Sequence, residues 1–385
     1  MTEAAPGAPR GSILILAGEP SGDHHAAALA AELRRRHPRL RLLGTGGPEM
    51  AAAGVELLAG LDELSVMGFV EVLPRIPYFR RLAARLRRLL DDDRPSLVVL
   101  VDYPGFNLRM AREAHERDIP VLYYISPQVW AWKHRRAHTM AEVTDRVAVI
   151  LPFETDFLGA YGVRATYVGH PLLDRPDDVP ERAAFLERHG LPGDRPVLAL
   201  LPGSRGQEIA RHLEPFRAIA ERVVRERSEV VPVFSRAPSL HAGPFLELGF
   251  PVVDDSRALQ RHATAALVKS GTSTLETALE GTPFAIGYRT SPATAWLARR
   301  LIRTEHIGLP NLVAGARVAP EFFQGALVPE RVAPVLLELL DEDSPVRRRQ
   351  VEALRAVRER LGEPGAAARV ADLADELLGV GSPSP

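Results

Sequence analysis

Three carboxylate side chains lie where two predicted strands of the first half end, and they could exchange protons with a substrate. Glu19 and Asp23 follow the apolar run at residues 13–16, and Asp102 follows the run at residues 97–101. The carboxyl ends of parallel strands share the sheet edge where ligands bind, so a carboxylate there could deprotonate a hydroxyl. Asp23 could instead cap the helix predicted to follow it. Asp102 directly ends a run of five apolar residues, which makes it the stronger candidate for a base.

A glycine-containing loop in the second half could bind an anion. Gly203, Ser204, Arg205 and Gly206 separate a predicted strand from a helix that we expect to begin near Glu208. Backbone N–H groups, the positive end of the helix dipole and the arginine fork can all be aimed at an anion from such a loop. A glycine turn next to a surface arginine explains the same residues, and the spacing does not distinguish the two interpretations.

A second loop has the same arrangement. Ser270, Gly271, Thr272 and Ser273 follow a predicted strand and precede a helix that we expect to carry Glu276 in its first turn. The hydroxyls could simply cap the helix, with Glu276 completing a capping box, and locally this is the better interpretation. Two anion-binding loops in one domain nevertheless suit a diphosphate, and an early helical glutamate could accept hydrogen bonds from a ribose diol. Together the loops favour a nucleoside diphosphate as the ligand.

Other kinds of site are disfavoured. The loop GEPSGD lacks the G-x-G-x-x-G spacing of a dinucleotide fold, and no G-x-x-x-x-G-K-[ST] sequence occurs. The chain has no cysteine, and the helical pair His134 and His138 has basic neighbours, which disfavour a cation. We therefore predict neither a metal nor a cofactor. The net charge of −1 argues against nucleic acid as a partner, because phosphate binding requires a surplus of basic residues.

The segments that must position these loops alternate between strands and helices. Predicted strands in the first half are residues 13–16, 40–43, 97–101, 121–125 and 147–151, and predicted helices are 26–36, 79–90 and 108–117. The pattern resumes with strands at 197–201, 230–234, 266–269 and 284–287 and ends in helices at 332–340, 347–361 and 366–378. Such alternation predicts parallel, doubly wound sheets. We expect an α/β protein with two Rossmann-like domains facing a central cleft.

The domain boundary is expected in the segment 174–196, which is rich in Pro, Asp and Gly. We assign residues 1–175 to an N-terminal domain and residues 176–360 to a C-terminal domain. Residues 361–385 are expected to form a C-terminal helix and tail that could pack back on the N-terminal domain. A chain of 385 residues is long enough for two cores.

A basic, apolar helix at 79–90 could contact a membrane surface. Phe79, Leu82, Leu86 and Leu89 form one helical stripe, and the remaining surface is rich in arginine. Such a helix can lie on anionic lipid, with an attraction of about 1 kcal/mol per basic residue. The alternative, which the helix taken alone favours, is that the leucines face the sheet and the arginines are solvated. No apolar run is long enough to span a bilayer, and the N-terminus shows no export signal.

Eight ordered motifs between residues 17 and 315 resemble the lipid-A-disaccharide synthase family of glycosyltransferases. They are AGEPSGD, GGPEMAAAG, VMGFVEVLPRIP, VDYPGFNL, YYISPQVWAWKHRR, LPGSRGQEI, SGTSTLE and GLPNLVAG. No single string is decisive, but the ordered set is highly specific. The resemblance implies the GT-B fold and an inverting transfer. In that reaction the 6-hydroxyl of 2,3-diacylglucosamine 1-phosphate (lipid X) attacks the anomeric carbon of UDP-2,3-diacylglucosamine, which gives a β-1,6-linked disaccharide and UDP.

The resemblance also implies roles for individual residues. Asp102 is the expected base, with Glu19 and Asp23 in the same catalytic set. The two glycine-containing loops are expected to bind UDP, with Arg205 neutralising the charge that grows on the leaving group. Glu276 would hold the ribose, and Asn311 would help to hold the nucleotide.

Acylated substrates imply an anionic inner-membrane surface as a further partner. The expected location is therefore cytoplasmic, with peripheral attachment to the inner face of the inner membrane of a Gram-negative-type bacterium. The residues expected to face the membrane are Met67, Phe69, Phe79, Arg81, Arg85 and Arg88.

Three positions depart from the family pattern. Gly105 stands where a second acid is usual, so Asp102 is expected to lack an acidic neighbour that tunes it. Gly308 replaces a usual serine, and Pro20 replaces a smaller residue. Two alternatives stay open: another GT-B enzyme acting on a UDP-amino sugar, such as a 2-epimerase or a non-lipid transferase, and a non-catalytic nucleotide-sugar-binding protein. Gly105 is the one feature that favours the second alternative.

Overall fold

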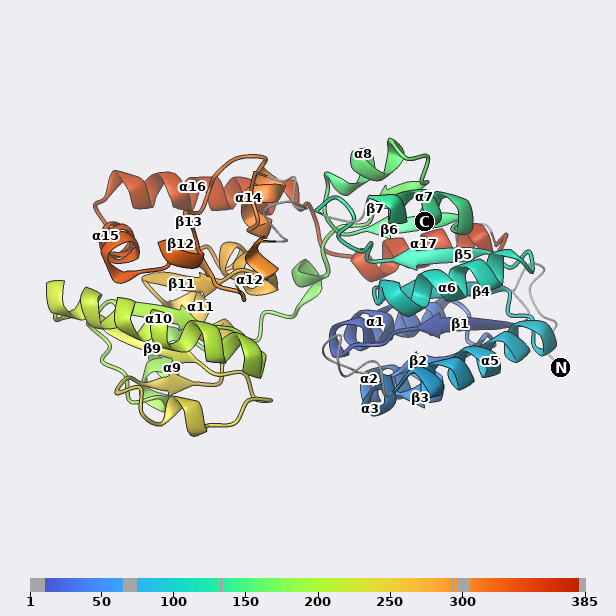
Figure 1. Cartoon of the computed structure of the whole chain (residues 1–385), viewed down its shortest axis with the longest axis horizontal. Helices are drawn as coiled ribbons and strands as arrows, with labels where there is room; N and C mark the ends of the chain where they lie inside the picture. Colours follow the sequence, from blue (N-terminus) through green and yellow to red (C-terminus); the bar gives the residue numbers. More distant parts are fainter. Residues whose placement is uncertain (1–10, 65–74, 132–133, 292–293, 297–304, 381–385) are drawn as a thin grey trace. The chain divides into compact units, whose positions relative to one another are not determined.

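The computed structural model describes residues 11–64, 75–131, 134–291, 294–296 and 305–380. The chain divides into two units, which we call unit 1 and unit 2. Unit 1 comprises Met1–Arg175 together with Glu363–Pro385, and unit 2 comprises Pro176–Gly362. Each unit contains one parallel β-sheet with helices on both faces (Figure 1). The predicted α/β class with parallel, doubly wound sheets is confirmed.

The sheet of unit 1 has seven strands in the order β3-β2-β1-β4-β5-β6-β7. The strands are β1 (Ser12–Leu16), β2 (Arg41–Gly46), β3 (Glu56–Gly60), β4 (Leu97–Val101), β5 (Val121–Tyr124), β6 (Arg146–Val149) and β7 (Ala165–Tyr167). The chain begins in the centre at β1, moves outward to β3, and then returns to place β4 on the other side of β1. The loops that follow β1 and β4 therefore diverge, which creates the kind of crevice where ligands of open α/β sheets bind.

The helices of unit 1 cover both faces of its sheet. They are α1 (Pro20–Arg36), α2 (Pro48–Ala52), α3 (Leu61–Leu64), α5 (Ile76–Asp92), α6 (Pro104–His115), α7 (Arg135–Val143), α8 (Glu154–Gly159), the 3₁₀ helix η2 (Pro171–Asp174) and α17 (Ala366–Leu377). Alternate residues of β1 point to opposite cores: Leu14 and Leu16 lie in one with α5 and α6, and Ile13 and Ile15 lie in the other with α1 and α17. Burial on both faces explains why these strands read as continuous apolar runs.

Helix α17 belongs to unit 1 although it lies at the other end of the sequence. Val370, Ala371 and Ala374 are buried in the core beside α1. Arg36 of α1 lies 2.9 Å from a carboxylate oxygen of the buried Asp375. Helix α17 therefore completes the core of the unit that carries Asp102, and it lies along β5 and β6 (Figure 1).

The sheet of unit 2 has six parallel strands in the order β10-β9-β8-β11-β12-β13. The strands are β8 (Val197–Leu201), β9 (Val231–Ser235), β10 (Val252–Val253), β11 (Ala265–Lys269), β12 (Phe284–Tyr288) and β13 (Glu321–Phe323). The order reverses between β8 and β11, which pair directly. The two glycine-containing loops follow these two strands, so they share the switch point of this sheet.

Two cores also enclose the sheet of unit 2. Its helices are α9 (Arg182–Arg188), α10 (Gly206–Glu226), η3 (Gly243–Phe245), α11 (Ser256–His262), α12 (Thr272–Leu279), α14 (Leu309–Ala314), η4 (Gln324–Ala326), α15 (Pro329–Leu340) and α16 (Pro345–Arg360). Helices α10 and α15 pack on one face and α9, α11 and α16 on the other. None of the helices in the described ranges combines the length and apolar character that crossing a membrane requires.

Some element boundaries differ from those predicted. Helix α1 begins at Pro20, six residues earlier than expected, because proline fits the first turn, where its missing N–H has no helical partner. Strand β2 continues to Gly46, although the glycines in its sequence do not favour a strand. Strands β3, β7, β10 and β13 were not predicted. They lie at or near the sheet edges, and β10 has only two residues, too few to show a pattern.

Candidate functional site

Asp102 lies at the end of β4, in a turn that is held from several sides. Its backbone φ is 47° and that of Tyr103 is 48°, so both residues adopt the left-handed conformation. The side-chain amide of Asn107 donates to the backbone carbonyl of Leu16 at 3.2 Å and to that of Asp102 at 2.8 Å. The hydroxyl of Tyr123 also donates to the carbonyl of Asp102, at 2.6 Å. These bonds fix the direction in which the Asp102 side chain leaves the sheet edge.

The environment of Asp102 favours its protonated form. Burial and, to a lesser extent, the negative charge of Glu19 raise the pKa of Asp102 to about 6, although a hydrogen bond from the Tyr103 amide opposes the shift. Burial penalises the charged carboxylate, and a nearby like charge adds to this penalty. A base with a pKa close to neutral combines a populated ionised form with a useful proton affinity. Asp102 therefore has the electrostatic properties of a general base.

Glu19 corrects an expectation drawn from Gly105. The sequence predicted that Asp102 would lack an acidic neighbour, because the position of the usual second acid is glycine. The structure supplies such a charge from the β1 loop, since Glu19 contributes to the raised pKa of Asp102. Gly105 itself is exposed, and a Cβ there would meet no atom within 4 Å.

A small cavity adjoins Asp102. It has a volume of 170 Å³ and is lined by Asp102, Pro104, Pro127, Gln128, Val129 and Arg136. The polar side chains are a carboxylate, a carboxamide and a guanidinium, and the remaining wall is apolar. Gln128 and Arg136 were not among the predicted site residues, although both lie within the motif that begins YYISPQVWAW. They lie beside Asp102 because of the way β5 and α7 pack, and the local sequence pattern does not predict this position.

Asp23 has a structural role instead of the predicted catalytic one. Its carboxylate is buried and accepts backbone N–H groups from Gly47 at 2.7 Å, Glu49 at 3.1 Å and Met50 at 3.1 Å. It therefore caps the N-terminus of α2 and not that of its own helix α1. Asp23 holds the β1 and β2 loops together, so it positions the site without supplying a proton acceptor.

The loop that follows β8 is organised around Glu208. Gly203 has φ of 130°, and a Cβ there would lie 2.6 Å from a carboxylate oxygen of Glu208, so a side chain does not fit. The amide of Ser204 donates to Glu208 at 3.0 Å, and the guanidinium of Arg205 lies 3.5 Å from it. Burial is the largest single influence and raises the pKa of Glu208, but the hydrogen bond and charge of Lys269, the Ser204 amide and the charge of Arg205 together lower it.

Lys269 connects this loop to the second one. Its ammonium lies 2.7 Å from the Glu208 carboxylate and 3.2 Å from the place where a Cβ on Gly271 would be. The ion pair therefore joins the first turn of α10 to the end of β11 and brings the two glycine-containing loops together. Sequence reasoning missed this role. A signal was present, because Lys133 and Lys269 are the only lysines in an arginine-rich chain.

The second loop does not form the capping box that the sequence favours locally. Helix α12 begins at Thr272 with Gly271 as its N-cap, so no side chain caps the helix. A capping box would need a glutamate at the third helical position, which is Thr274. Glu276 lies two residues later and is half-buried. Ser270 is buried at the end of β11, whereas Thr272 is exposed at the start of the helix.

Asn311 does not lie in a ligand-binding position. Its side chain is fully buried, and its amide nitrogen donates to Ala319 at 2.8 Å and to Glu321 at 2.9 Å. Its amide oxygen accepts backbone N–H groups from Val318 at 2.8 Å and Ala319 at 2.7 Å. These four bonds tie α14 to β13, so the predicted direct contact of Asn311 with a nucleotide is wrong for this structure.

His134 and His138 pack against aromatic residues. The ring of His138 meets that of Tyr161 edge-on with centroids 5.0 Å apart, and Nδ1 of His134 lies 3.2 Å from the Tyr161 hydroxyl. Within the part of the chain that the structure describes, no three potential metal ligands of the His, Asp or Glu type converge. The pair joins the N-terminal part of α7 to the turn that follows α8.

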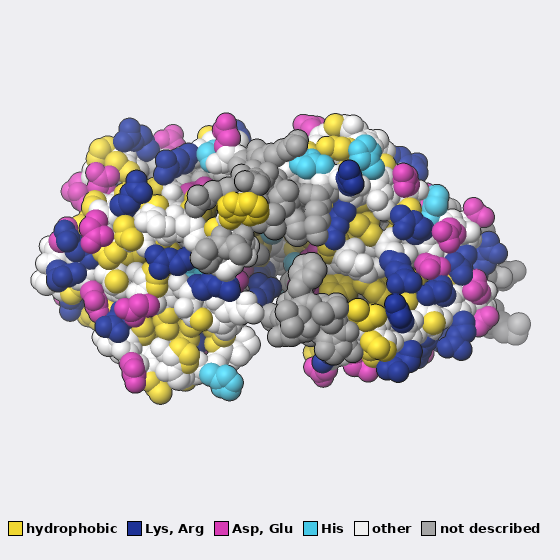
Figure 2. All heavy atoms as spheres, viewed as in Figure 1, with side chains coloured by type: hydrophobic (Ala, Val, Ile, Leu, Met, Phe, Trp, Pro, Cys, Tyr) yellow, Lys and Arg dark blue, Asp and Glu magenta, His cyan; other side chains and the backbone are white. Residues whose placement is uncertain are grey.

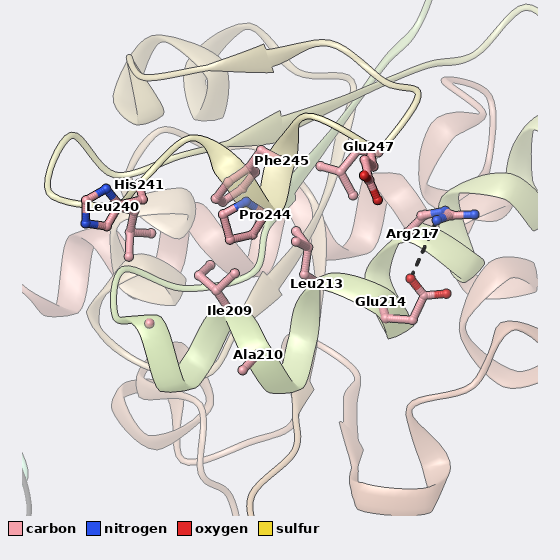
Figure 3. A pocket seen from close by; sticks show the side chains of 12 residues that line it. Ile209, Ala210, Leu213, Glu214, Arg217, Leu240, His241, Pro244, Phe245 and Glu247 are labelled. Atoms are coloured by element: carbon pink, nitrogen blue, oxygen red, sulfur yellow. Dashed lines mark ion pairs between the residues drawn. The ribbon is translucent and has the colours of Figure 1, made fainter.

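A groove on unit 2 lies along α10 and has a mostly apolar wall. Its volume is 440 Å³, it begins at Gly206, and its apolar wall includes Ile209, Leu213 and Phe245 (Figure 3). At one end Glu214 and Arg217 form an ion pair at 3.8 Å. The charged or titratable residues His241 and Glu247 also line the groove.

Helix α5 uses its apolar stripe inside unit 1. Leu82 and Leu86 are buried in the core, and Phe79 packs against it with its ring 5.9 Å from that of Phe106. Phe79 is only partly buried, so its expected contact with a membrane stays a prediction. Met67 and Phe69 lie outside the described residues. The alternative in which the leucines face the sheet is the one observed.

The opposite face of α5 is basic. Arg80, Arg81, Arg85 and Arg88 are exposed, and Figure 2 shows Lys and Arg side chains gathered over this part of unit 1. Arg85 also donates to the carbonyl of Leu58, in the middle of β3, at 2.7 Å. The exposed surface of α5 is therefore positively charged, whereas the leucines of its apolar stripe face the core of unit 1.

The comparisons with solved structures define the class of this protein. The calicheamicin glycosyltransferase CalG4 is 20% identical, with a TM-score of 0.59 over 97% of this chain and 100% of that one. A putative UDP-N-acetylglucosamine 2-epimerase from Listeria monocytogenes is 12% identical, with a TM-score of 0.65 over 96% and 97% of the two chains. At such identities the likeness concerns the fold alone, and the fold is that of GT-B glycosyltransferases.

Sequence comparison then gives the family. The pattern of the family described as lipid-A-disaccharide synthetase matches residues 13–371. The lipid-A-disaccharide synthase of Myxococcus xanthus (strain DK1622) is 42% identical over 95% of this chain and 97% of its own length. That of Anaeromyxobacter sp. (strain K) is 43% identical over 96% and 97%. The chain belongs to the lipid-A-disaccharide synthase family.

The raised pKa of Asp102 has a measurable cost in stability. Its carboxyl has a pKa of about 6 in the folded chain against an ordinary 3.8, so folding is penalised as pH rises through this window. The full penalty, up to about 3 kcal/mol, is present above pH 6 and absent below pH 4. Asparagine tolerates the left-handed backbone of position 102. We therefore expect the stability of Asp102→Asn relative to the parent chain to be up to about 3 kcal/mol greater at pH 8 than at pH 4.

Urea unfolding at the two pH values tests this expectation. Changing Trp296 to Phe in every variant leaves tryptophan fluorescence to report on unit 1, which holds the other two tryptophans. Asp118→Asn is the matched control, because Asp118 is exposed and has a similar φ of 55°. A relative stability of Asp102→Asn that does not change with pH would contradict the raised pKa.

Proposed function

We propose that this chain is a lipid-A-disaccharide synthase. It joins UDP-2,3-diacylglucosamine to 2,3-diacylglucosamine 1-phosphate (lipid X), and the products are the β-1,6-linked disaccharide 1-phosphate and UDP. Family membership over nearly the whole chain supports this assignment. The observation that carries the mechanism is Asp102, a carboxylate with a pKa of about 6 that follows β4 at the switch point of unit 1 and lines a cavity.

Asp102 acts as the general base in this proposal. It takes the proton from the 6-hydroxyl of lipid X while that oxygen forms a bond to the anomeric carbon of the donor. The bond from this carbon to the diphosphate breaks at the opposite face, and its electron pair leaves with UDP. One base and one stabilised leaving group are sufficient for inversion.

The switch point of unit 2 stabilises the leaving group. Arg205 is exposed at the start of α10, where its guanidinium and the N–H groups of the loop can meet a diphosphate. The ion pair between Lys269 and Glu208 keeps the two loops in register and leaves positive charge beside Gly271. The half-buried Glu276 of α12 accepts hydrogen bonds from the ribose.

The two alternatives are less well supported. A 2-epimerase or a non-lipid transferase shares the fold at 12–20% identity, whereas the relatives that are 42% and 43% identical over nearly the whole chain are lipid-A-disaccharide synthases. A non-catalytic binding protein was favoured by Gly105 alone. Glu19 weakens that argument, because it provides the like charge that raises the proton affinity of Asp102.

The acylated substrates favour action at a membrane surface. The exposed arginines of α5 would attract anionic lipid, and we propose peripheral attachment to the cytoplasmic face of the inner membrane. Because the leucine stripe is buried, charge and not insertion of α5 supplies the attraction in this proposal.

A coupled assay tests the proposed reaction. The purified chain mixed with the two diacyl sugars is expected to release UDP and the disaccharide, and Asp102→Asn is expected to lower kcat at least about 100-fold, as loss of a general base does. UDP affinity, measured by calorimetry, should stay within about threefold because the UDP loops lie in unit 2. Asp118→Asn is the control.

Two results would overturn parts of this assignment. Undiminished turnover by Asp102→Asn would remove Asp102 as the base. Tight UDP binding by the parent chain without any disaccharide would instead favour the non-catalytic alternative.

Vesicle binding tests the membrane contact. The double variant Arg81→Glu, Arg88→Glu is expected to bind vesicles of anionic phospholipid at least about 10-fold more weakly, since each arginine contributes about 1 kcal/mol. Arg85 is left in place because it also bonds to Leu58. The control is Arg348→Glu, Arg349→Glu on the exposed surface of α16, and equal losses in the two variants would argue against a specific contact by α5.

A further inference from the structure

We propose that the cavity beside Asp102 is a phosphate-recognition subsite, in which Arg136 and Gln128 bind the anomeric phosphate of the acceptor. This inference rests on the proposed function and adds to it the residues that distinguish a phosphorylated acceptor from an unphosphorylated one. It depends on the position of Arg136, on the state of its charge and on the size of the cavity.

Arg136 shares a cavity with the proposed base. Arg136 and Asp102 both line the same cavity of 170 Å³. Arg136 lies in the first turn of α7, and this helix is anchored in the core by Ala137, Met140 and Val143. The cation therefore projects from a fixed element and has a defined place relative to the base.

The charge of Arg136 is available to a ligand. Among the residues that the structure describes, no carboxylate forms an ion pair with Arg136, and Asp102 is no exception. The pKa of Asp102 is raised by burial and by Glu19, with no opposing contribution from Arg136. Arg136 is nevertheless half-buried and close enough to the Asp102 turn to act on the buried phenol of Tyr123, whose pKa it lowers against the larger effect of burial. A half-buried guanidinium without a partner favours an anion.

The chemistry of the acceptor matches these two groups. Its sugar carries a hydroxyl that must lose a proton and a phosphate that carries negative charge. Arginine binds phosphate through two parallel N–H donors, and the exposed Gln128 at the same cavity can add an amide donor. Sites for drug-sized ligands measure about 300–1,000 Å³, so this cavity accommodates a polar head and not the acyl chains.

The donor also contains phosphates, so the experiment must separate the two sources. Initial rates are measured in mixed micelles with two acceptors, 2,3-diacylglucosamine 1-phosphate and the same sugar without its phosphate. Arg136→Gln is expected to lower kcat/KM about 10- to 100-fold for the phosphorylated acceptor, which is the loss expected for a charge-assisted hydrogen bond. Turnover of the unphosphorylated acceptor and the KM for the donor should stay within about threefold.

Matched variants keep the test independent of folding. Arg135→Gln changes an exposed neighbour on the same helix and is expected to leave both acceptors unaffected. Arg136→Lys keeps the charge but loses the fork, so it should reduce kcat/KM only for the phosphorylated acceptor, and by less than Arg136→Gln.

The remaining outcomes contradict the proposal. Equal losses with both acceptors would make Arg136 a structural residue, and a higher KM for the donor would assign it to the UDP-sugar. Failure of the parent chain to use either acceptor would overturn the proposed function itself, which is a different result from any loss of discrimination in the variants.

Discussion

The chemistry of unit 1 depends on keeping one carboxylate partly buried beside another of the same charge. The two loops that carry them follow β1 and β4, which are adjacent although far apart in the sequence. Side-chain hydrogen bonds from Asn107 and Tyr123 to the carbonyl of Asp102 hold its turn, and Asp23 holds the neighbouring β2 loop. Ionised Asp102 is therefore destabilised at this edge of the sheet. The same effect raises its pKa and gives it the proton affinity of a base near neutral pH.

Unit 2 places positively charged side chains, Arg205 and Lys269, near its two glycine-containing loops. Glu208 neutralises part of the charge of Lys269, but its main effect is geometric, because it bonds to the Ser204 amide and to Lys269 at once. Gly203 has no room for a side chain next to Glu208. The loops of two different strands thus become one surface, which a diphosphate needs if both of its phosphates are to be bound. In each unit the charged groups lie at the switch point between two central strands. They are carboxylates in unit 1 and basic side chains in unit 2.

The alternation of apolar runs with helical periods was sufficient to predict the parallel sheets, because both patterns are local. The same reasoning located Asp102 and the two loops, since all three follow predicted strands directly. It failed where the partners are distant. Asp23 accepts hydrogen bonds from residues 24 or more positions later in the sequence. The side chain of Asn311 forms its hydrogen bonds with the segment around β13. Arg136 lines the cavity only because of the way α7 packs. The stripe of α5 shows the same limit, because an apolar face indicates burial without naming what covers it.

The pH dependence of kcat/KM for lipid X in the parent chain and in Glu19→Gln tests the role of Asp102 most directly. The parent chain is expected to lose activity about tenfold per pH unit below about pH 6, where Asp102 becomes protonated. Removing the charge of Glu19 should move this break to lower pH, because one of the two causes of the raised pKa is gone. A break that stays at the same pH in both proteins would contradict the account. It would assign the titration to another group, such as the phosphate of the acceptor, whose second pKa is about 6.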